Sequence, residues 1–288
     1  MIATQARTVL ITGGTSGIGR ATALAHARNG FHVVIIGRRP AETSQTTEWL
    51  RRESDNRNIE FLIADLTSQE QVRRVAREFA ATHQRLDVLI NNAGGVFAEW
   101  GLTSDGVERT WALNHLAPLL LSLELVPLLE ASAPSRIVNV ASSAQSNGKI
   151  ELGHVHDRDA FSMNAYSNAK LANVMTTYVL ARRLSGTGVT VNALHPGVVA
   201  TSFGKNTRGW IAALSTLAGP FLLTPERGAA TSVHLASAPE VERVTGTFFV
   251  KSKPRRSSPA SYDRDLQEQV WQAALSEIGC EDLQLRHA

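Results

Sequence analysis

The stretch that decides the fold lies near the start of the chain and reads Thr8-Val9-Leu10-Ile11-Thr12-Gly13-Gly14-Thr15-Ser16-Gly17-Ile18-Gly19. An apolar, β-branched run leads directly into a glycine-rich turn. Gly13 permits a sharp turn after the strand, Gly17 lets a pyrophosphate approach the backbone, and Gly19 lets the following helix pack closely. Free N–H groups at the start of that helix favour phosphate. The turn predicts a dinucleotide site at Gly13, Thr15, Ser16, Gly17, Ile18 and Gly19, and a glycine turn without a ligand is the alternative.

Outward from this turn, short apolar runs alternate with amphipathic segments along the chain. Because the apolar runs do not alternate with polar residues, they fit strands buried on both faces. The pattern predicts an α/β fold of the Rossmann type, a doubly wound parallel sheet of about seven strands with helices on both faces, as one domain over residues 1–288. Ser68 and Gln71 have the spacing of a capping box at a helix start. We expect strands at 8–12, 31–36, 59–64, 87–91, 136–141, 189–194 and 247–250, and helices at 17–29, 68–83, about 104–130, 165–184 and about 263–278.

Length and composition narrow the class of protein. The chain has 288 residues, of which 43% are apolar and 19% charged, so intrinsic disorder and fibrous repeats are excluded. A net charge of +3 is too weak to predict a nucleic-acid partner. One cysteine, Cys280, excludes a disulfide framework and a cysteine-rich metal site. His154 and His156 lie in a polar loop without further ligands, so we expect a solvated loop and no metal.

We expect neither a signal peptide nor a membrane-spanning segment in this sequence. The N-terminal residues resemble a first strand rather than a signal peptide. The apolar stretch 116–129 contains two prolines and a glutamate and is too short to cross a bilayer. We therefore expect a cytoplasmic protein without a membrane span. The basic loop Lys251–Arg256 receives no role from the sequence.

The residues after the second expected strand bear on the choice of dinucleotide. That strand ends in Ile36-Gly37-Arg38-Arg39, and no carboxylate stands where an acidic residue would bind the ribose 2′-hydroxyl of NAD. Two guanidinium groups can instead hold a 2′-phosphate by bidentate hydrogen bonds. Arg38 and Arg39 therefore predict NADP(H), and a pair of solvated surface arginines is the alternative.

A tyrosine and a lysine four positions apart point to acid–base chemistry. Tyr166 and Lys170 lie on one face of an expected helix. A free tyrosine has a pKa of about 10, which a neighbouring ammonium lowers. Such a group can exchange a proton with an alcohol oxygen. Ser142 follows the strand at 136–141, at the end of the sheet where ligands bind in open α/β folds. Asn114 lies inside a helix although asparagine is a poor helix former, which requires a reason.

Taken together, these motifs resemble the short-chain dehydrogenase/reductase family over essentially the whole chain. Within that family the sequence is most similar to the retinol dehydrogenase and protochlorophyllide reductase-like branch. In chain order, the motifs are Thr12-Gly13-x-x-x-Gly17-x-Gly19, Asp65-Leu66, Asn91-Asn92-Ala93-Gly94, Asn114, Ser142, Tyr166-x-x-x-Lys170 and Pro196-Gly197-x-x-x-Thr201.

The resemblance implies a role for each matching position. Tyr166 would be the general acid/base, Lys170 would lower its pKa and bind the nicotinamide ribose, and Asn114 would hold a water of a proton relay. Ser142 would orient the substrate carbonyl, with Ser143 as the other candidate. The implied cofactor contacts are Asp65 and Leu66 at the adenine, Asn91, Ala93 and Gly94 at the middle, and Pro196, Gly197, Val199 and Thr201 at the nicotinamide.

The sequence departs from the compact tetrameric members of that family in one respect. Ser142 and Tyr166 are 24 positions apart, a longer gap than in those members. This puts the usual tetramer in doubt and leaves a homodimer or a monomer.

The apolar segment 201–224 resembles a substrate lid, which favours a bulky hydrophobic carbonyl or alcohol, although packing on the core is an equal alternative. Three functions remain open: an NADP(H)-dependent oxidoreductase, a redox-neutral isomerisation or cyclisation at the same site, and a cofactor sensor without turnover. The substrate and the direction of the reaction stay undetermined.

Overall fold

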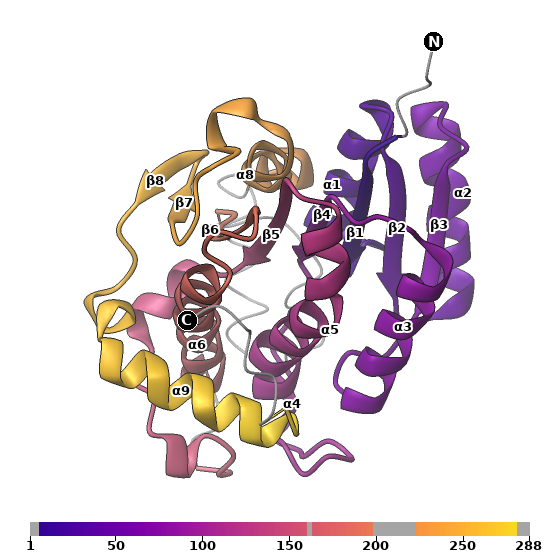
Figure 1. Ribbon diagram of the computed structural model, residues 1–288. Coiled ribbons are helices and arrows are strands. Elements are labelled where there is room, and N and C mark those ends of the chain that lie inside the picture. The colour runs from indigo at the N-terminus through magenta and orange to yellow at the C-terminus, as the bar shows by residue number, and fades with distance from the viewer. Residues whose placement is uncertain (1–5, 160–162, 198–222, 281–288) are drawn as a thin grey trace.

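A sheet of eight strands passes through the centre of the computed structural model, which describes residues 6–159, 163–197 and 223–280 (Figure 1). The strand order is β3-β2-β1-β4-β5-β6-β7-β8. The strands are β1 (Thr8–Thr12), β2 (His32–Gly37), β3 (Ile59–Ile63), β4 (Val88–Asn91), β5 (Ser135–Val140), β6 (Val189–His195), β7 (Phe248–Val250) and β8 (Lys253–Arg255). All neighbouring pairs from β3 to β7 are parallel.

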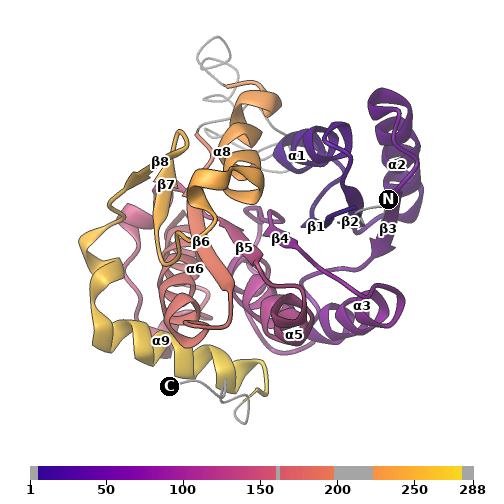
Figure 2. The ribbon, with the colours of Figure 1, turned by 45° about the horizontal axis from the view of Figure 1, so that its top comes forward.

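Helices cover both faces of this sheet (Figure 2). One layer holds α1 (Gly17–Arg28), α2 (Pro40–Ser54) and α8 (Pro225–Ser237), and the other holds α3 (Gln69–Thr82), α5 (Ala117–Ala131) and α6 (Met163–Arg183). The terminal helix α9 (Arg264–Glu277) lies against α6. Along β1, Leu10 packs toward the α3 and α5 side while Val9 and Ile11 pack toward α1, and all three are fully buried. The prediction of a doubly wound α/β sheet is confirmed.

The strand order reverses beside β1, and this reversal positions the ligand site. β1 pairs with β2 on one side and with β4 on the other. The connections after β1 and β4 therefore leave toward opposite faces, and a crevice opens at the carboxyl ends of the strands. The glycine-rich turn follows β1 directly at that point.

The eighth strand corrects the expected count of about seven. β8 runs antiparallel to β7 after a two-residue turn at Lys251 and Ser252, whose φ angles are 51° and 58°. Its residues are Lys253, Pro254 and Arg255, all exposed. Charged side chains and proline on an edge strand discourage pairing with another chain. The basic loop thus forms a protected sheet edge.

Two helices differ from the expected pattern. α2 was not predicted, because three threonines (Thr43, Thr46 and Thr47) stand with Leu50 on its buried face and hide the apolar period. The helix expected from about residue 104 begins at Arg109 and contains a π-helical turn at Ala112–Leu116 before α5.

The start of α3 and the apolar helix around residues 116–129 also differ from what the sequence predicts. Ser68 caps α3 as predicted, but the Gln71 side chain accepts from the Asp65 N–H instead of returning to Ser68. The apolar stretch 116–129 belongs to a longer helical stretch, Arg109–Ala131, which by length and composition alone could cross a membrane. Its most apolar part is, however, 72% buried inside the protein, as expected of a core helix.

Candidate active site

The glycine-rich turn has the backbone geometry that close approach of a ligand requires. Gly13 and Gly17 have φ angles of 67° and 52°, which glycine adopts without strain. A Cβ on Gly19 would lie 2.2 Å from the Gly13 carbonyl oxygen, so only glycine fits there. Ser16 is the N-cap of α1, and its side chain caps no N–H group of the helix. The start of α1 is therefore left uncapped by its N-cap side chain, which suits the binding of an anion there.

The segment after β4 is tied to this turn by the Thr12 hydroxyl. Thr12 Oγ1 accepts hydrogen bonds from the N–H groups of Asn92 and Ala93, both at 2.9 Å. The Asn92 side chain returns two bonds, to the Thr12 carbonyl at 2.9 Å and to the Gly13 carbonyl at 3.3 Å. The structure thus brings the predicted contacts Ala93 and Gly13 together. The side chains of Thr12 and Asn92 were not among the predicted site residues, although both stand inside the motifs quoted above.

Asn91 has a different environment from its neighbours. Its side-chain amide is buried and donates to Asn139 Oδ1 at 2.8 Å and to Ser122 Oγ at 3.0 Å. These bonds join β4 to β5 and α5 inside the protein. The described contacts of its side chain are therefore structural.

Asn114 holds the loop after β4 from the π-helical turn. Its Nδ2 donates to the carbonyls of Gly95 and Thr110, both at 2.8 Å, and its Oδ1 accepts from the Gly95 N–H at 3.1 Å. Its own carbonyl accepts from Asn173 Nδ2 at 3.0 Å. The wider π turn often marks functional sites, and here it explains why an asparagine stands inside the helix. The water-holding role of Asn114 stays a prediction.

Gly94 lies between Asn114 and the buried lysine. A Cβ there would lie 2.7 Å from Asn114 Oδ1 and 3.2 Å from Lys170 Nζ. Lys170 is buried, and its Nζ donates to the Val140 carbonyl at 2.9 Å. The predicted residues from β4, the π turn and α6 therefore converge at the end of β5.

Tyr166 and Ser142 meet at this same end of the sheet. Ser142 follows β5 as the N-cap of a 3₁₀ turn, and a side-chain hydrogen bond joins it to Tyr166. Ser143 is exposed, and its N–H donates to His195 Nδ1 at 3.1 Å. Of the two serines, the structure therefore places Ser142 at the tyrosine. His195, which was not among the predicted site residues, accepts this bond and so holds the neighbouring backbone.

Burial shifts the pKa values of both members of the acid–base pair. Burial raises the pKa of Tyr166 to about 12, and the bond to Ser142 only partly opposes this shift. Burial also lowers the pKa of Lys170 to about 7. The role of Lys170 in lowering the pKa of Tyr166 stays a prediction. Lys170 Nζ lies 5.7 Å from the centre of the tyrosine ring.

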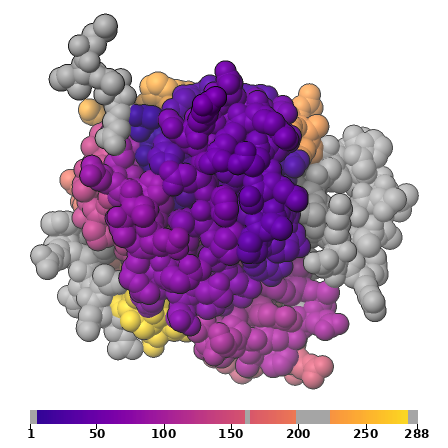
Figure 3. Space-filling view, turned by 90° about the vertical axis from the view of Figure 1, so that its right-hand side faces the viewer, coloured from indigo at the N-terminus to yellow at the C-terminus, as the bar shows by residue number. Residues whose placement is uncertain are grey.

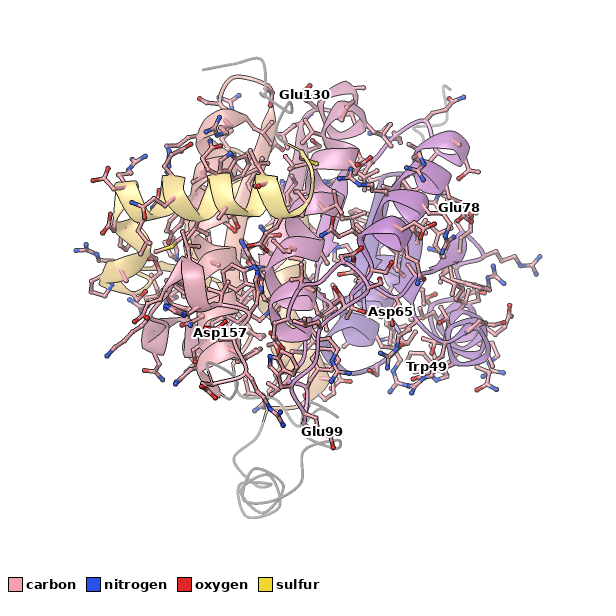
Figure 4. All side chains as sticks on the ribbon, turned by 90° about the horizontal axis from the view of Figure 1, so that it is seen from below. Trp49, Asp65, Glu78, Glu99, Glu130 and Asp157 are labelled. Atoms are coloured by element: carbon pink, nitrogen blue, oxygen red, sulfur yellow. The ribbon has the colours of Figure 1, made fainter. Side chains whose placement is uncertain are left out.

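The residues after β2 and β3 lie side by side at the edge of the crevice. The register pairs Gly37 with Ile63, so Arg38 and Asp65 follow neighbouring strand ends. Arg38 Nη1 lies 3.8 Å from Asp65 Oδ2, and Arg39 pairs with Glu42. Asp65 is labelled in Figure 4. The fold thus brings two carboxylates to these arginines, Asp65 from the segment after β3 and Glu42 from α2.

The arginines nevertheless remain accessible. The side chains of Arg38 and Arg39 are 60% and 69% exposed. Exposed ion pairs of this kind contribute little to stability and can rearrange. Leu66, the other predicted adenine contact, is buried in the core on the α3 side.

The nicotinamide end of the predicted site is described only in part. Pro196 and Gly197 follow β6, which pairs with β5, and Gly197 has a φ of 90°. A Cβ on Gly197 would lie 2.5 Å from Leu223 Cδ1. Val199, Thr201 and most of the predicted lid (201–222) lie outside the described residues.

The two histidines that could have suggested a metal site lie apart from these residues. His154 is exposed and pairs with Asp157 at 2.7 Å; Asp157 is labelled in Figure 4. His156 Nε2 lies 3.4 Å from Glu277 Oε1 at the end of α9. His154 thus lies in a solvated loop, as expected.

Known proteins are similar in sequence to this chain over most of its length. The family model for short chain dehydrogenases matches residues 7–212. Retinol dehydrogenase 14 of Mus musculus is 37% identical over 287 residues, covering 95% of this chain and 86% of that protein. Retinol dehydrogenase 13 of Homo sapiens is 36% identical over 282 residues, covering 96% and 85%.

Solved structures share the fold as well. An uncharacterised protein from Mycobacterium paratuberculosis superposes with a TM-score of 0.76 at 28% identity, covering 95% of this chain and 93% of its own. The NADP complex of Pseudomonas aeruginosa RhlG gives a TM-score of 0.69 at 28% identity, covering 85% and 95%. A short chain dehydrogenase of Escherichia coli CFT073 complexed with NADPH gives 0.68 at 25% identity, covering 86% and 97%. By its sequence matches and by its fold, the chain belongs to the short-chain dehydrogenase family.

Proposed function

We propose that this protein is an NADP(H)-dependent oxidoreductase that transfers a hydride between the nicotinamide and a bulky hydrophobic ketone, aldehyde or alcohol. The observation that carries the proposal is the hydrogen bond between Ser142 and Tyr166 at the carboxyl end of β5, one helical turn from buried Lys170. A serine beside a buried tyrosine at this sheet end can orient a carbonyl oxygen and give it a proton.

The residues present fit a dinucleotide. The start of α1, which its N-cap side chain leaves uncapped, suits the pyrophosphate. Glycines at positions 19 and 94 let the turn and the loop after β4 pack closely at the site, because a Cβ at either position would lie too close to protein atoms. Bound NADP(H) supplies or accepts the hydride. Arg38 and Arg39 are the groups that we assign to the 2′-phosphate, and the NADP-bound structural relatives support this choice.

The protonation state of Tyr166 favours its action as an acid. Because burial raises the pKa of Tyr166 to about 12, the phenol keeps its proton at neutral pH. It can therefore give that proton to the oxygen of a carbonyl as the bond order falls. Lys170, whose pKa burial lowers to about 7, can bind ribose hydroxyls and return a proton toward Tyr166. A protonated Tyr166 is the form that reduction of a carbonyl requires.

The substrate class follows from the relatives rather than from the described residues. Retinol, which the names of the related dehydrogenases print, is a long apolar primary alcohol. It belongs to the bulky hydrophobic class that the apolar segment 201–224 favours. Retinal and other bulky aldehydes and ketones are therefore the first substrates to test.

The decisive experiment replaces the proposed acid. In Tyr166→Phe we expect NADPH binding within about twofold of wild type and a loss of at least about a hundredfold in turnover, since general acid catalysis contributes about 10²–10⁴. Tyr178→Phe is the matched control, because Tyr178 is also buried on α6 but bonds to Ser257. Unimpaired turnover in Tyr166→Phe would refute the assignment. NADPH consumption at one per product separates hydride transfer from a redox-neutral reaction.

A further inference from the structure

Two histidines and a glutamate gather at the end of the sheet opposite the candidate active site. His32 opens β2, Glu60 lies in β3, and His83 directly follows α3. One ligand atom from each lies within 4.8 Å of the other two. His32 and Gly37 stand at opposite ends of β2, so the cluster is about 16 Å along the strand from the Arg38 region. Figure 3 views the molecule from this edge, where the N-terminal part of the chain forms most of the visible surface.

The hydrogen bonds of His83 determine which of its ring nitrogens is free. Its Nδ1 lies 3.1 Å from the Phe79 carbonyl oxygen, which can only accept, so Nδ1 carries the hydrogen. Thr82 Oγ1 lies 2.9 Å from the same nitrogen, while its own hydroxyl donates to the Glu78 carbonyl. Glu78 is labelled on α3 in Figure 4. In the neutral ring, Nε2 therefore presents a lone pair.

That lone pair faces a carboxylate. His83 Nε2 lies 3.7 Å from Glu60 Oε2, and His32 Nε2 lies 2.9 Å from Glu60 Oε1. With the hydrogen on Nδ1, the neutral His83 ring and Glu60 face each other with two hydrogen-bond acceptors, Nε2 and Oε2. A cation between them would turn this unfavourable arrangement into a favourable one. A metal-bound histidine also commonly donates its second N–H to a backbone carbonyl, as His83 does to Phe79.

The spacing suits a small tetrahedral ion. Bonds of about 2.0–2.1 Å to Zn²⁺ place neighbouring tetrahedral ligand atoms about 3.3 Å apart. The distances from His32 Nε2 to Glu60 Oε1, 2.9 Å, and from His83 Nε2 to Glu60 Oε2, 3.7 Å, lie on either side of this value. A rotation of the carboxylate would be needed for one oxygen to face both rings. The two histidine rings, with centres 5.1 Å apart, must approach by side-chain rotation. Glu60, 55% exposed, is free to follow that movement.

From this geometry we propose that His32, Glu60 and His83 form a binding site for a divalent metal ion of the Zn²⁺ class, with water as the fourth ligand. The ion replaces the proton that His32 Nε2 shares with Glu60. Its three ligands come from β2, β3 and the end of α3, so the bound ion joins the edge of the sheet to its covering helix. The site is structural and separate from the hydride-transfer site.

The test uses the full chain, stripped with EDTA and titrated with ZnCl₂ by calorimetry. We expect one Zn²⁺ per chain and a melting temperature that rises with Zn²⁺. Glu60→Gln and His83→Gln should each weaken binding at least about tenfold and remove the thermal shift. His154→Gln is the matched control, because His154 also pairs with a carboxylate but lacks a third ligand, and it should bind Zn²⁺ as wild type does.

Two results would overturn the proposal. One is the absence of stoichiometric Zn²⁺ binding to wild type. The other is unchanged binding in Glu60→Gln and His83→Gln, which would place the ion elsewhere, for example at Cys280. His83 is buried and stacks on Phe79, so its replacement can disturb folding. Exposed Glu60→Gln gives the independent reading, with circular dichroism as the folding control.

Discussion

The Thr12 hydroxyl offers the sharpest test of how the site is built. Thr12→Val keeps the shape of the side chain but removes the acceptor of two hydrogen bonds, from the N–H groups of Asn92 and Ala93. An unsatisfied buried polar group costs about 1–3 kcal/mol. Water can reach part of the Asn92–Ala93 segment, which lowers the cost of leaving its two N–H groups unsatisfied. We therefore expect the free energy of unfolding to fall by about 2–4 kcal/mol.

The same substitution should also weaken cofactor binding. Thr12 holds the segment after β4 against the glycine-rich turn, so its loss loosens both sides of the proposed dinucleotide site. We expect the dissociation constant for NADPH, measured by fluorescence titration, to rise at least about tenfold, which corresponds to about 1.4 kcal/mol. Urea unfolding of the same samples gives the stability change.

A matched control is present on the neighbouring helix. Thr22 is fully buried on α1, and its hydroxyl has no hydrogen-bond partner within the described part of the chain. Thr22→Val removes a hydroxyl of the same kind without orphaning any partner, so its stability should stay within about 0.5 kcal/mol of wild type or increase. If Thr12→Val and Thr22→Val changed stability and NADPH affinity equally, the assigned function of the Thr12 hydroxyl would be refuted.

Three other predictions concern the serine, the arginines and a buried histidine. Ser142→Ala should lower kcat at least about tenfold while Ser143→Ala changes it less than about twofold, because a hydrogen bond contributes about 1–1.5 kcal/mol; equal effects would contradict the placement of Ser142. Replacing Arg38 and Arg39 together with alanine should reduce the ratio of NADP to NAD affinity at least about tenfold, since a hydrogen bond to a charged group contributes about 1.5–3 kcal/mol; an unchanged ratio would contradict their assignment to the 2′-phosphate. Burial lowers the pKa of His115 to about 3, below its ordinary value of 6.5, so the unfolded chain binds more protons and stability falls as pH drops below 6.5. Between pH 6.5 and 4 this group alone should cost about 3 kcal/mol, and His115→Leu should flatten the pH dependence of urea unfolding; an equally steep dependence in the variant would show that other groups cause it.

Sequence reasoning found those parts of the fold that depend on local patterns. β1 was predicted with the bounds it has, because its apolar run and the glycine after it are contiguous. α2 was missed because its buried face carries threonines, which no apolar period reveals. β8 was missed because a short, charged edge strand has no apolar pattern.

In the candidate site, too, local spacing could be predicted from the sequence and contacts between distant segments could not. Tyr166 and Lys170 are one helical turn apart, so the sequence alone could place them on one face of α6. The resemblance already favoured Ser142 over Ser143, and the tertiary structure adds the hydrogen bond that joins Ser142 to Tyr166. The hydrogen bonds from Asn92 to the Thr12 and Gly13 carbonyls likewise join segments about eighty positions apart.

By itself, the sequence determined the alternation of strands and helices, the glycine-rich turn and the spacing of the acid–base pair, because each is written in residues close together in the chain. Only the tertiary structure decided the protonation of Tyr166 and the meeting of His32, Glu60 and His83. A pKa depends on how much solvent the whole fold removes from a group. A cluster of ligands depends on which distant strands and helix ends the sheet brings to one edge.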